Sequence, residues 1–126
     1  MRAIDTNVLV RLVTRDDASQ VAAAEAFVEM GAWVSHLVLV ETTWVLRSLF
    51  QLNSAHLATA LDMLLNHNDL TVQDADVVAA ALQQFQAKPS VGFSDCLVLE
   101  VARKAGHLPL GTFDRGQAKL DGTERI

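Results

Sequence analysis

The chain has 126 residues, of which 51% are hydrophobic, and carries a formal net charge of −5 at pH 7. This length and composition predict one folded domain over residues 1–126 with a real hydrophobic core and no disordered segment. The acidic balance excludes the simple basic surface that is typical of nucleic-acid-binding proteins, and no apolar stretch is long enough to predict a membrane span.

The cellular compartment is predicted from the N-terminus and from cysteine usage. The sequence begins directly with a predicted strand and lacks the long apolar segment of a secretory signal peptide. Its single cysteine, Cys96, excludes an internal disulfide and is expected to be a small core residue. Together these features predict a cytoplasmic protein.

Strands and helices are predicted to alternate along the chain. The first strand ends on Asp5, and we expect it to be buried. The predicted helices cover residues 6–13, 16–30, 37–50, 55–65, 74 or 76 to 85, and 95–104, with a helical turn within 114–120. The later strands cover residues 32–34, 70–72, 108–112 and 124–126. Ser94 is the expected N-cap of the helix that begins at Asp95.

This alternation predicts the fold class. Strands that are separated by helices are typical of a parallel sheet with right-handed crossovers, in which helices cover both faces. The sequence therefore predicts an α/β fold with a short, mainly parallel sheet of four to five strands.

Four carboxylates occupy positions that a solvated helix face does not explain. Asp5 and Asp114 follow strands, Asp95 starts a helix, and Glu41 lies within an apolar helical segment. Because strand ends and helix starts of a parallel sheet meet at one edge, we expect the four to lie together there. Taken singly, each has a simpler explanation as a turn former, a helix cap or an exposed helix residue.

Glu41 is the least usual of the four. The residues one turn away from it are all apolar: Leu37, Val38, Trp44 and Val45. A carboxylate in such surroundings is costly unless its charge is compensated. The same segment has a second possible role, since Leu37, Val40 and Trp44 could form a partner surface in place of the core expected for Trp44.

Clustered carboxylates predict a metal site. Several carboxylates in one crevice repel one another, and a hard divalent cation relieves that repulsion. Mg²⁺ or Mn²⁺ prefers oxygen ligands and keeps several waters, whereas zinc would require paired Cys or His residues that this sequence lacks. Such a site suits hydrolysis of a phosphodiester bond.

At these residues the chain resembles the PIN-domain family of metal-dependent ribonucleases, and most closely the VapC-type toxins of bacterial toxin–antitoxin pairs. The resemblance rests on four segments spread over nearly the whole chain: Ile4-Asp-Thr-Asn-Val-Leu-Val-Arg11, Val40-Glu-Thr-Thr-Trp-Val-Leu46, Phe93-Ser-Asp-Cys-Leu97 and Thr112-Phe-Asp114. It implies a three-layer αβα sandwich and an endoribonuclease that uses Mg²⁺ or Mn²⁺.

The resemblance also assigns roles to residues. It carries the family's catalytic acids over to four positions, which form the acidic quartet: Asp5, Glu41, Asp95 and Asp114. Asp5, Asp95 and Asp114 are the expected metal ligands, while Glu41 is expected to ligate water or help to deprotonate the nucleophile. Asn7 and Thr112 are the expected supporting residues, together with Thr6 beside Asn7.

The resemblance further implies an RNA substrate, a homodimer and inhibition by a small cognate antitoxin. Because the chain is acidic, RNA binding requires a local basic rim, for which we select Arg11, Arg47 and Arg115. If these are ordinary solvated helix charges, reversing all three leaves cleavage unchanged.

Two further kinds of function are compatible with the sequence. A receiver-like binding module that accepts a phosphate on Asp also needs acids at strand ends, but it requires a late Lys that the strand 108–112 lacks. Within the family, the chain could also be a PIN nuclease that is not a toxin, or an inactive PIN domain that only binds a partner. The complete set of acids argues against the inactive form.

Overall fold

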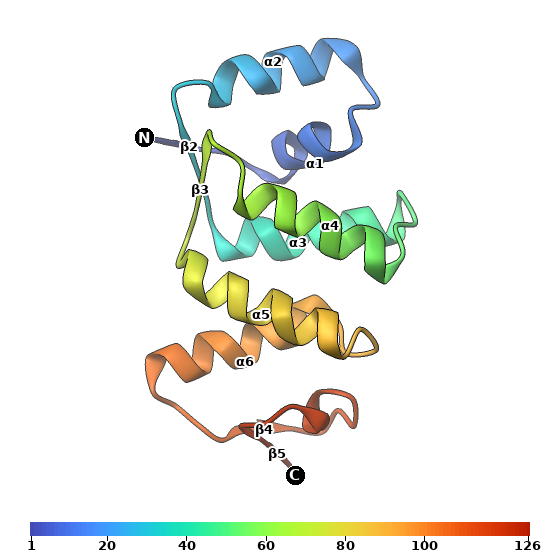
Figure 1. Ribbon diagram of the computed structural model, residues 1–126, viewed down its shortest axis with the longest axis vertical. Helices are drawn as coiled ribbons and strands as arrows, with labels where there is room; N and C mark the ends of the chain where they lie inside the picture. Colours follow the sequence, from blue (N-terminus) through green and yellow to red (C-terminus); the bar gives the residue numbers. More distant parts are fainter. The chain divides into compact units, whose positions relative to one another are not determined.

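The computed structural model describes residues 1–126 and consists of two compact units, Met1–Ala75 and Asp76–Ile126. The chain forms six α-helices, one short 3-10 helix and five strands (Figure 1). Every strand pairing is parallel, within a set of three strands and a set of two. The predicted α/β class with short parallel strands is therefore confirmed. None of the helices combines the length and the apolar character needed to cross a membrane.

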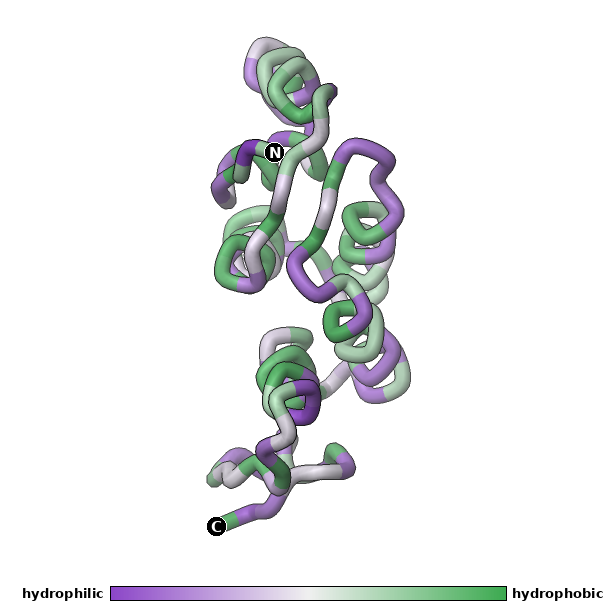
Figure 2. Tube along the Cα trace, turned by 90° about the vertical axis from the view of Figure 1, so that its left-hand side faces the viewer, coloured by the Kyte–Doolittle hydropathy of each residue, from purple (hydrophilic) through white to green (hydrophobic).

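The first unit contains a three-stranded parallel sheet and four helices. Its strands are β1 (Arg2–Ala3), β2 (Ala32–Val34) and β3 (Leu70–Val72), in the order β1-β2-β3. Its helices are α1 (Thr6–Thr14), α2 (Ala18–Val28), α3 (His36–Ser48) and α4 (Ser54–Leu65). In the register, Ala32 lies opposite both Arg2 and Leu70. Helices flank the strands on both sides in Figure 2.

Local sequence explains where these four helices begin. Each is preceded by a polar residue whose side-chain oxygen accepts a backbone N–H of the first turn: Asp5, Asp17, Ser35 and Asn53. These caps satisfy donors that have no partner inside the helix. The helices then bury aliphatic side chains such as Leu9, Leu39 and Leu61, which form the core of the unit.

The first strand differs from the prediction. We expected a buried strand, but β1 is only two residues long and both residues are exposed; Ile4, which follows it, is the buried residue. β1 is an edge strand that pairs with β2 alone. The Ile4 amide still donates to the carbonyl oxygen of Trp33 at 3.1 Å, so the backbone remains tied to the sheet up to Asp5.

The second unit contains two helices and a pair of strands. Its elements are α5, which spans Ala75–Ala87 and starts at the boundary, α6 (Phe93–Ala105), β4 (Leu110–Thr112), the 3-10 helix η1 (Gln117–Lys119) and β5 (Thr123–Arg125). Phe85 of α5 and Phe93 of α6 meet edge to face, with ring centroids 6.2 Å apart and an interplanar angle of 78°. Cys96 is fully buried, as predicted for a core residue.

The start of α6 also differs from the prediction. The helix begins at Phe93, and the N-cap position belongs to Gly92, which makes no side-chain cap bond, so the assignment of Ser94 as the cap was wrong. Phe93 is buried against Phe85, and this packing favours a helical turn that starts earlier than the local sequence predicts. Asp95 consequently lies inside the first turn.

Candidate active site

Asp5 stands between β1 and α1 in the first unit. Its backbone is extended, and its Oδ1 atom accepts the amide of Val8 at 3.3 Å, so it caps α1. The residue is exposed. One carboxylate oxygen therefore holds the helix start, and the side chain remains accessible to solvent and to a ligand.

Glu41 of α3 is linked to the start of α1 by a hydrogen bond. The Oγ1 hydroxyl of Thr6, the residue directly after Asp5, donates to the Oε1 atom of Glu41. Thr6 is buried, so this bond also satisfies a polar group that water does not reach. The first unit therefore brings Glu41 beside the helix start that Asp5 caps.

The surroundings of Glu41 are not those that the sequence predicted. Glu41 is exposed, and its neighbours Leu37 and Trp44 are 83% and 66% exposed, so both the buried apolar setting and the core position of Trp44 were wrong. The buried side of α3 carries Leu39, Thr42, Thr43 and Leu46 instead. The threonines tolerate burial because their hydroxyls donate to backbone carbonyls one turn earlier.

Asp95 and Asp114 interact in the second unit. Burial raises the pKa of Asp95 above its ordinary value, and the negative charge of Asp114 is the second, smaller cause of the same shift. Asp114 follows β4 and is exposed, whereas Asp95 is half-buried in the first turn of α6. The two carboxylates therefore repel each other in the way that was expected of a cation-binding pair.

Gln117 connects these two acids, although no motif in the sequence had singled it out. Its backbone amide donates to Oδ1 of Asp114 at 2.9 Å, and its side-chain Nε2 donates to the backbone carbonyl of Asp95 at 3.2 Å. Gln117 is buried. The available signal was the spacing Asp114-x-x-Gln117, which resembles a helix capping box.

Thr112 lies where the prediction placed a supporting residue. Its buried hydroxyl accepts the backbone amide of Asp114 at 3.0 Å. This bond sets the path of the chain between β4 and Asp114. Asn7, the other predicted supporting residue, is exposed in the first turn of α1.

Cys96 is adjacent to Asp95 but is poorly suited to act as a nucleophile. Burial, followed by the charges of Asp95 and Glu100, raises the pKa of its thiol to about 11. The thiolate form that attacks substrates is therefore disfavoured.

The three arginines selected for a basic rim differ in their exposure and in their ion pairing. Arg11 forms an ion pair with Asp16, which offsets its charge, and its side chain is only 22% exposed. Arg47 is exposed and donates to the Ser54 hydroxyl at 3.0 Å, and Arg115 is exposed. Arg11 is thus poorly suited to attract phosphate, whereas the exposed Arg47 and Arg115 stay the predicted rim residues.

The donor set fits a hard divalent cation. None of the four ion pairs in the structure includes a member of the acidic quartet, so no protein cation neutralises these carboxylates. The structure places two acids of the quartet in each unit, and no group of three or more acidic, histidine or cysteine side chains is assembled for a metal. Mg²⁺ needs only one or two protein carboxylates and fills its other positions with water.

The comparison with known proteins decides the family. The PIN domain model matches residues 3–123, which include all four acids of the quartet. The chain belongs to the PIN-domain family. No curated protein matches the chain.

Membership of this family establishes the general class of activity. PIN domains are nucleases, which hydrolyse phosphodiester bonds, and they typically use divalent metal ions. The match therefore favours the nuclease over the receiver-like module that the sequence left open.

The pKa of Asp95 predicts a pH-dependent effect on stability. A raised pKa means that the folded state holds the proton more tightly, so stability falls as the pH rises from about 4 through the folded pKa. Asn cannot ionise, so Asp95→Asn should melt about 1–3 °C above the wild type near neutral pH, a small gain because solvent screens the charges. The gap should close below about pH 4. Thermal melts of metal-free protein over this range measure it, and a less stable variant at neutral pH would contradict it.

Proposed function

We propose that this PIN domain is an Mg²⁺- or Mn²⁺-dependent endoribonuclease. The single observation that carries the proposal is the pair formed by Asp95 and Asp114, two carboxylates that repel each other and have no protein cation as partner. A carboxylate pair is costly for a fold to keep unless a ligand uses it. Metal-assisted hydrolysis is the chemistry that such a pair serves in a nuclease.

In the proposed site, Asp5, Asp95 and Asp114 would be the residues that hold the cation, directly or through its waters. When bound, such a cation would supply a lowered pKa of its bound water and an offset to the charge on the phosphate. Asp114 is aimed by its bond to the Gln117 amide and by the bond from its own amide to Thr112. Asp5 is aimed by its cap bond to the Val8 amide.

Glu41 moves the proton in this proposal. Thr6 occupies its Oε1 atom, which leaves Oε2 to accept a proton from the attacking water. An exposed carboxylate can then release that proton to solvent. Hydrolysis would proceed by in-line attack of water on phosphorus; the P–O bond to the leaving oxygen breaks, that oxygen takes a proton from solvent, and no covalent enzyme intermediate forms.

Purified protein and a structured RNA test the activity. We expect cleavage products with Mg²⁺ or Mn²⁺, none with EDTA, and recovery when metal is restored. Single-stranded DNA of the same sequence distinguishes a ribonuclease from a general nuclease. Cleavage that persists in EDTA would refute the metal-dependent mechanism.

Gln117 is proposed to be a positioning residue, and its removal gives a specific prediction. Gln117→Ala loses the side-chain bond to the Asp95 carbonyl and should weaken Mn²⁺ binding about 10-fold, as is typical when a residue that orients a metal ligand is lost. Isothermal titration of Mn²⁺ measures the effect without relying on cleavage. The matched control is Gln86→Ala, an exposed glutamine of the same unit. Equal Mn²⁺ affinity in both variants would leave Gln117 with a purely structural role.

The biological role is proposed to be that of a VapC-like toxin, cytoplasmic and homodimeric, that a small antitoxin inhibits. Support comes from the exposed face of α3, where Leu37, Glu41 and Trp44 follow one another at helical spacing. Exposed large apolar residues in such a row are typical of a protein partner. A small DNA-binding protein encoded beside this gene, and loss of cleavage when it is added, would support the toxin role; a monomer by light scattering would exclude the homodimer.

We further propose that the two compact units act as one domain over residues 1–126. The family model spans both of them, and each supplies two of the four acids. A single cooperative unfolding transition, monitored by two probes, is the expected result.

A further inference from the structure

A cavity of about 330 Å³ lies in the first unit between α1 and α2. Its lining comes from two consecutive helices: Asn7, Val8, Arg11, Gln20, Ala23, Ala24 and Phe27. A volume of this size is within the range of sites for small ligands. The cavity has no role in the mechanism described above.

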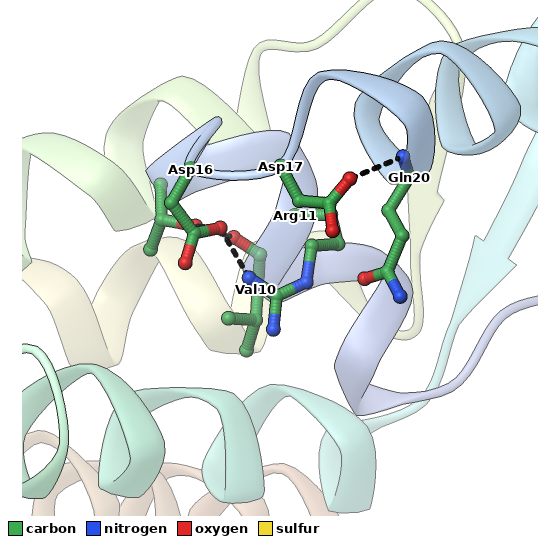
Figure 3. A network of polar contacts seen from close by, with 6 residues as sticks. Val10, Arg11, Asp16, Asp17 and Gln20 are labelled. Atoms are coloured by element: carbon green, nitrogen blue, oxygen red, sulfur yellow. Dashed lines mark hydrogen bonds and ion pairs between the residues drawn. The ribbon is translucent and has the colours of Figure 1, made fainter.

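The charge in this cavity is balanced. Arg11 lines it, but the guanidinium is paired with Asp16, and the bond from Arg11 lowers the pKa of that carboxyl, which stays ionised (Figure 3). A phosphate group therefore gains little here. A neutral group with hydrogen-bonding edges suits the cavity better.

The cavity contains polar side-chain groups that are available to hydrogen-bond a ligand. The Nε–H group of Arg11 is buried and has no acceptor, so the guanidinium can donate one more hydrogen bond in addition to its ion pair with Asp16. The carboxamides of Asn7 and Gln20 can each donate and accept. The bond between Gln20 and Asp17 is made by the backbone amide of Gln20, so the side-chain carboxamide of Gln20 is available to a ligand in the cavity (Figure 3).

The remaining walls are apolar and include one aromatic ring. Phe27 is held by Arg2, whose guanidinium lies 3.7 Å from the ring centroid and donates to the Phe27 carbonyl at 3.0 Å. Small side chains at Ala23 and Ala24 keep the cavity open. A planar heterocycle matches apolar walls, amide groups and a guanidinium donor at once.

The position of the cavity connects it to the proposed active site. Asn7 lines the cavity and belongs to the first turn of α1, two residues after Asp5. We propose that the cavity binds one nucleobase of the RNA strand next to the scissile phosphate, and that it sets a base preference for cleavage. This inference rests on the proposed ribonuclease function.

Binding of mononucleotides tests the cavity without requiring cleavage. The four nucleoside 5′-monophosphates are titrated into metal-free protein, with ribose 5-phosphate as the probe that lacks a base, and the side-chain signals of Asn7, Arg11 and Gln20 are followed by NMR. At least one nucleotide should shift all three signals, while ribose 5-phosphate should not. If no nucleotide shifts them, or if ribose 5-phosphate does so equally, the proposal is overturned.

A pair of matched variants locates the binding. Ala23 and Ala22 are adjacent exposed alanines of α2, and Ala23 lines this cavity whereas Ala22 does not. Ala23→Leu should weaken nucleotide binding about 10-fold, the order of one lost base-stacking contact, and Ala22→Leu should change it less than about twofold. Equal effects of the two variants would show that the base binds elsewhere.

Cleavage assays then separate the two proposals. A series of RNAs is prepared in which each carries one abasic ribose, at a different position. For the wild type, the cleavage rate should fall about 10-fold when the abasic ribose stands at one particular position and should change little at the others. For Ala23→Leu, an abasic ribose at that same position should not lower the cleavage rate. Uniform sensitivity in both proteins would overturn the base preference. If nucleotides bind but no RNA is cut, the ribonuclease function fails and the cavity assignment stands as base binding alone.

Discussion

Asp95→Asn is expected to lower the rate of RNA cleavage at least about 100-fold, and Asp5→Asn should do the same, because each removes a charged oxygen from the cation site. The fold should survive both changes. Asn is as good an N-cap as Asp, so α1 keeps its cap at position 5, and Asp95 loses only an unfavourable charge. Cleavage in Mg²⁺ and the circular dichroism of each variant provide the two measurements.

Two further carboxylates serve as matched controls for these variants. Asp17 caps α2 as Asp5 caps α1, and Asp76 lies in the first turn of α5 as Asp95 lies in that of α6. Neither belongs to the quartet, so Asp17→Asn and Asp76→Asn should cleave RNA at the wild-type rate. Full activity of Asp5→Asn or Asp95→Asn would refute the assignment of the acids. A loss of activity in the controls would show that helix capping or general charge, and not the quartet, had been tested.

Phe85→Ala is expected to reduce the free energy of unfolding by about 3–5 kcal/mol, the usual cost of removing a buried aromatic side chain. Phe85 is fully buried on α5 and meets Phe93 edge to face, so the deletion removes both apolar burial and a ring contact. Urea unfolding monitored by circular dichroism measures the change, since the midpoint falls while the slope stays the same.

Phe113 supplies the control for this stability prediction. It is 78% exposed, so Phe113→Ala makes the same chemical change without emptying a packed site. We expect it to alter the free energy of unfolding by no more than about 0.5 kcal/mol. A similar loss in both variants would mean that the packing of Phe85 against Phe93 contributes little.

Several features of this protein followed directly from local sequence. Asp17, Ser35 and Asn53 cap helices, because an N-cap depends on one side chain and the turn that follows it. The α/β class followed from the alternation of elements, which depends on hydrophobic periodicity along the chain. The short strands at 32–34 and 70–72 lie where they were expected.

Glu41 shows where local reasoning failed. Its apolar neighbours predicted a buried face, but α3 buries its threonines and exposes Leu37 and Trp44. The side of a helix that faces the core depends on what packs against it, and the neighbours in sequence do not determine this when both sides carry apolar residues. The exposed strand β1 has a similar origin, because which strand residues are covered depends on the elements that pack against the sheet.

For the candidate site, too, some features followed from the sequence and others were visible only in the tertiary structure. The sequence by itself indicated the PIN family, which the family model confirms, and it predicted the four acids and the preference for a hard cation, because these depend on residue type and spacing. Only the tertiary structure disclosed the bond from Thr6 to Glu41, the link through Gln117 between Asp95 and Asp114, and the cavity beside Arg11. Each joins atoms from different elements, and the physical reason is that such contacts depend on the packing of helices and strands, which no local pattern encodes.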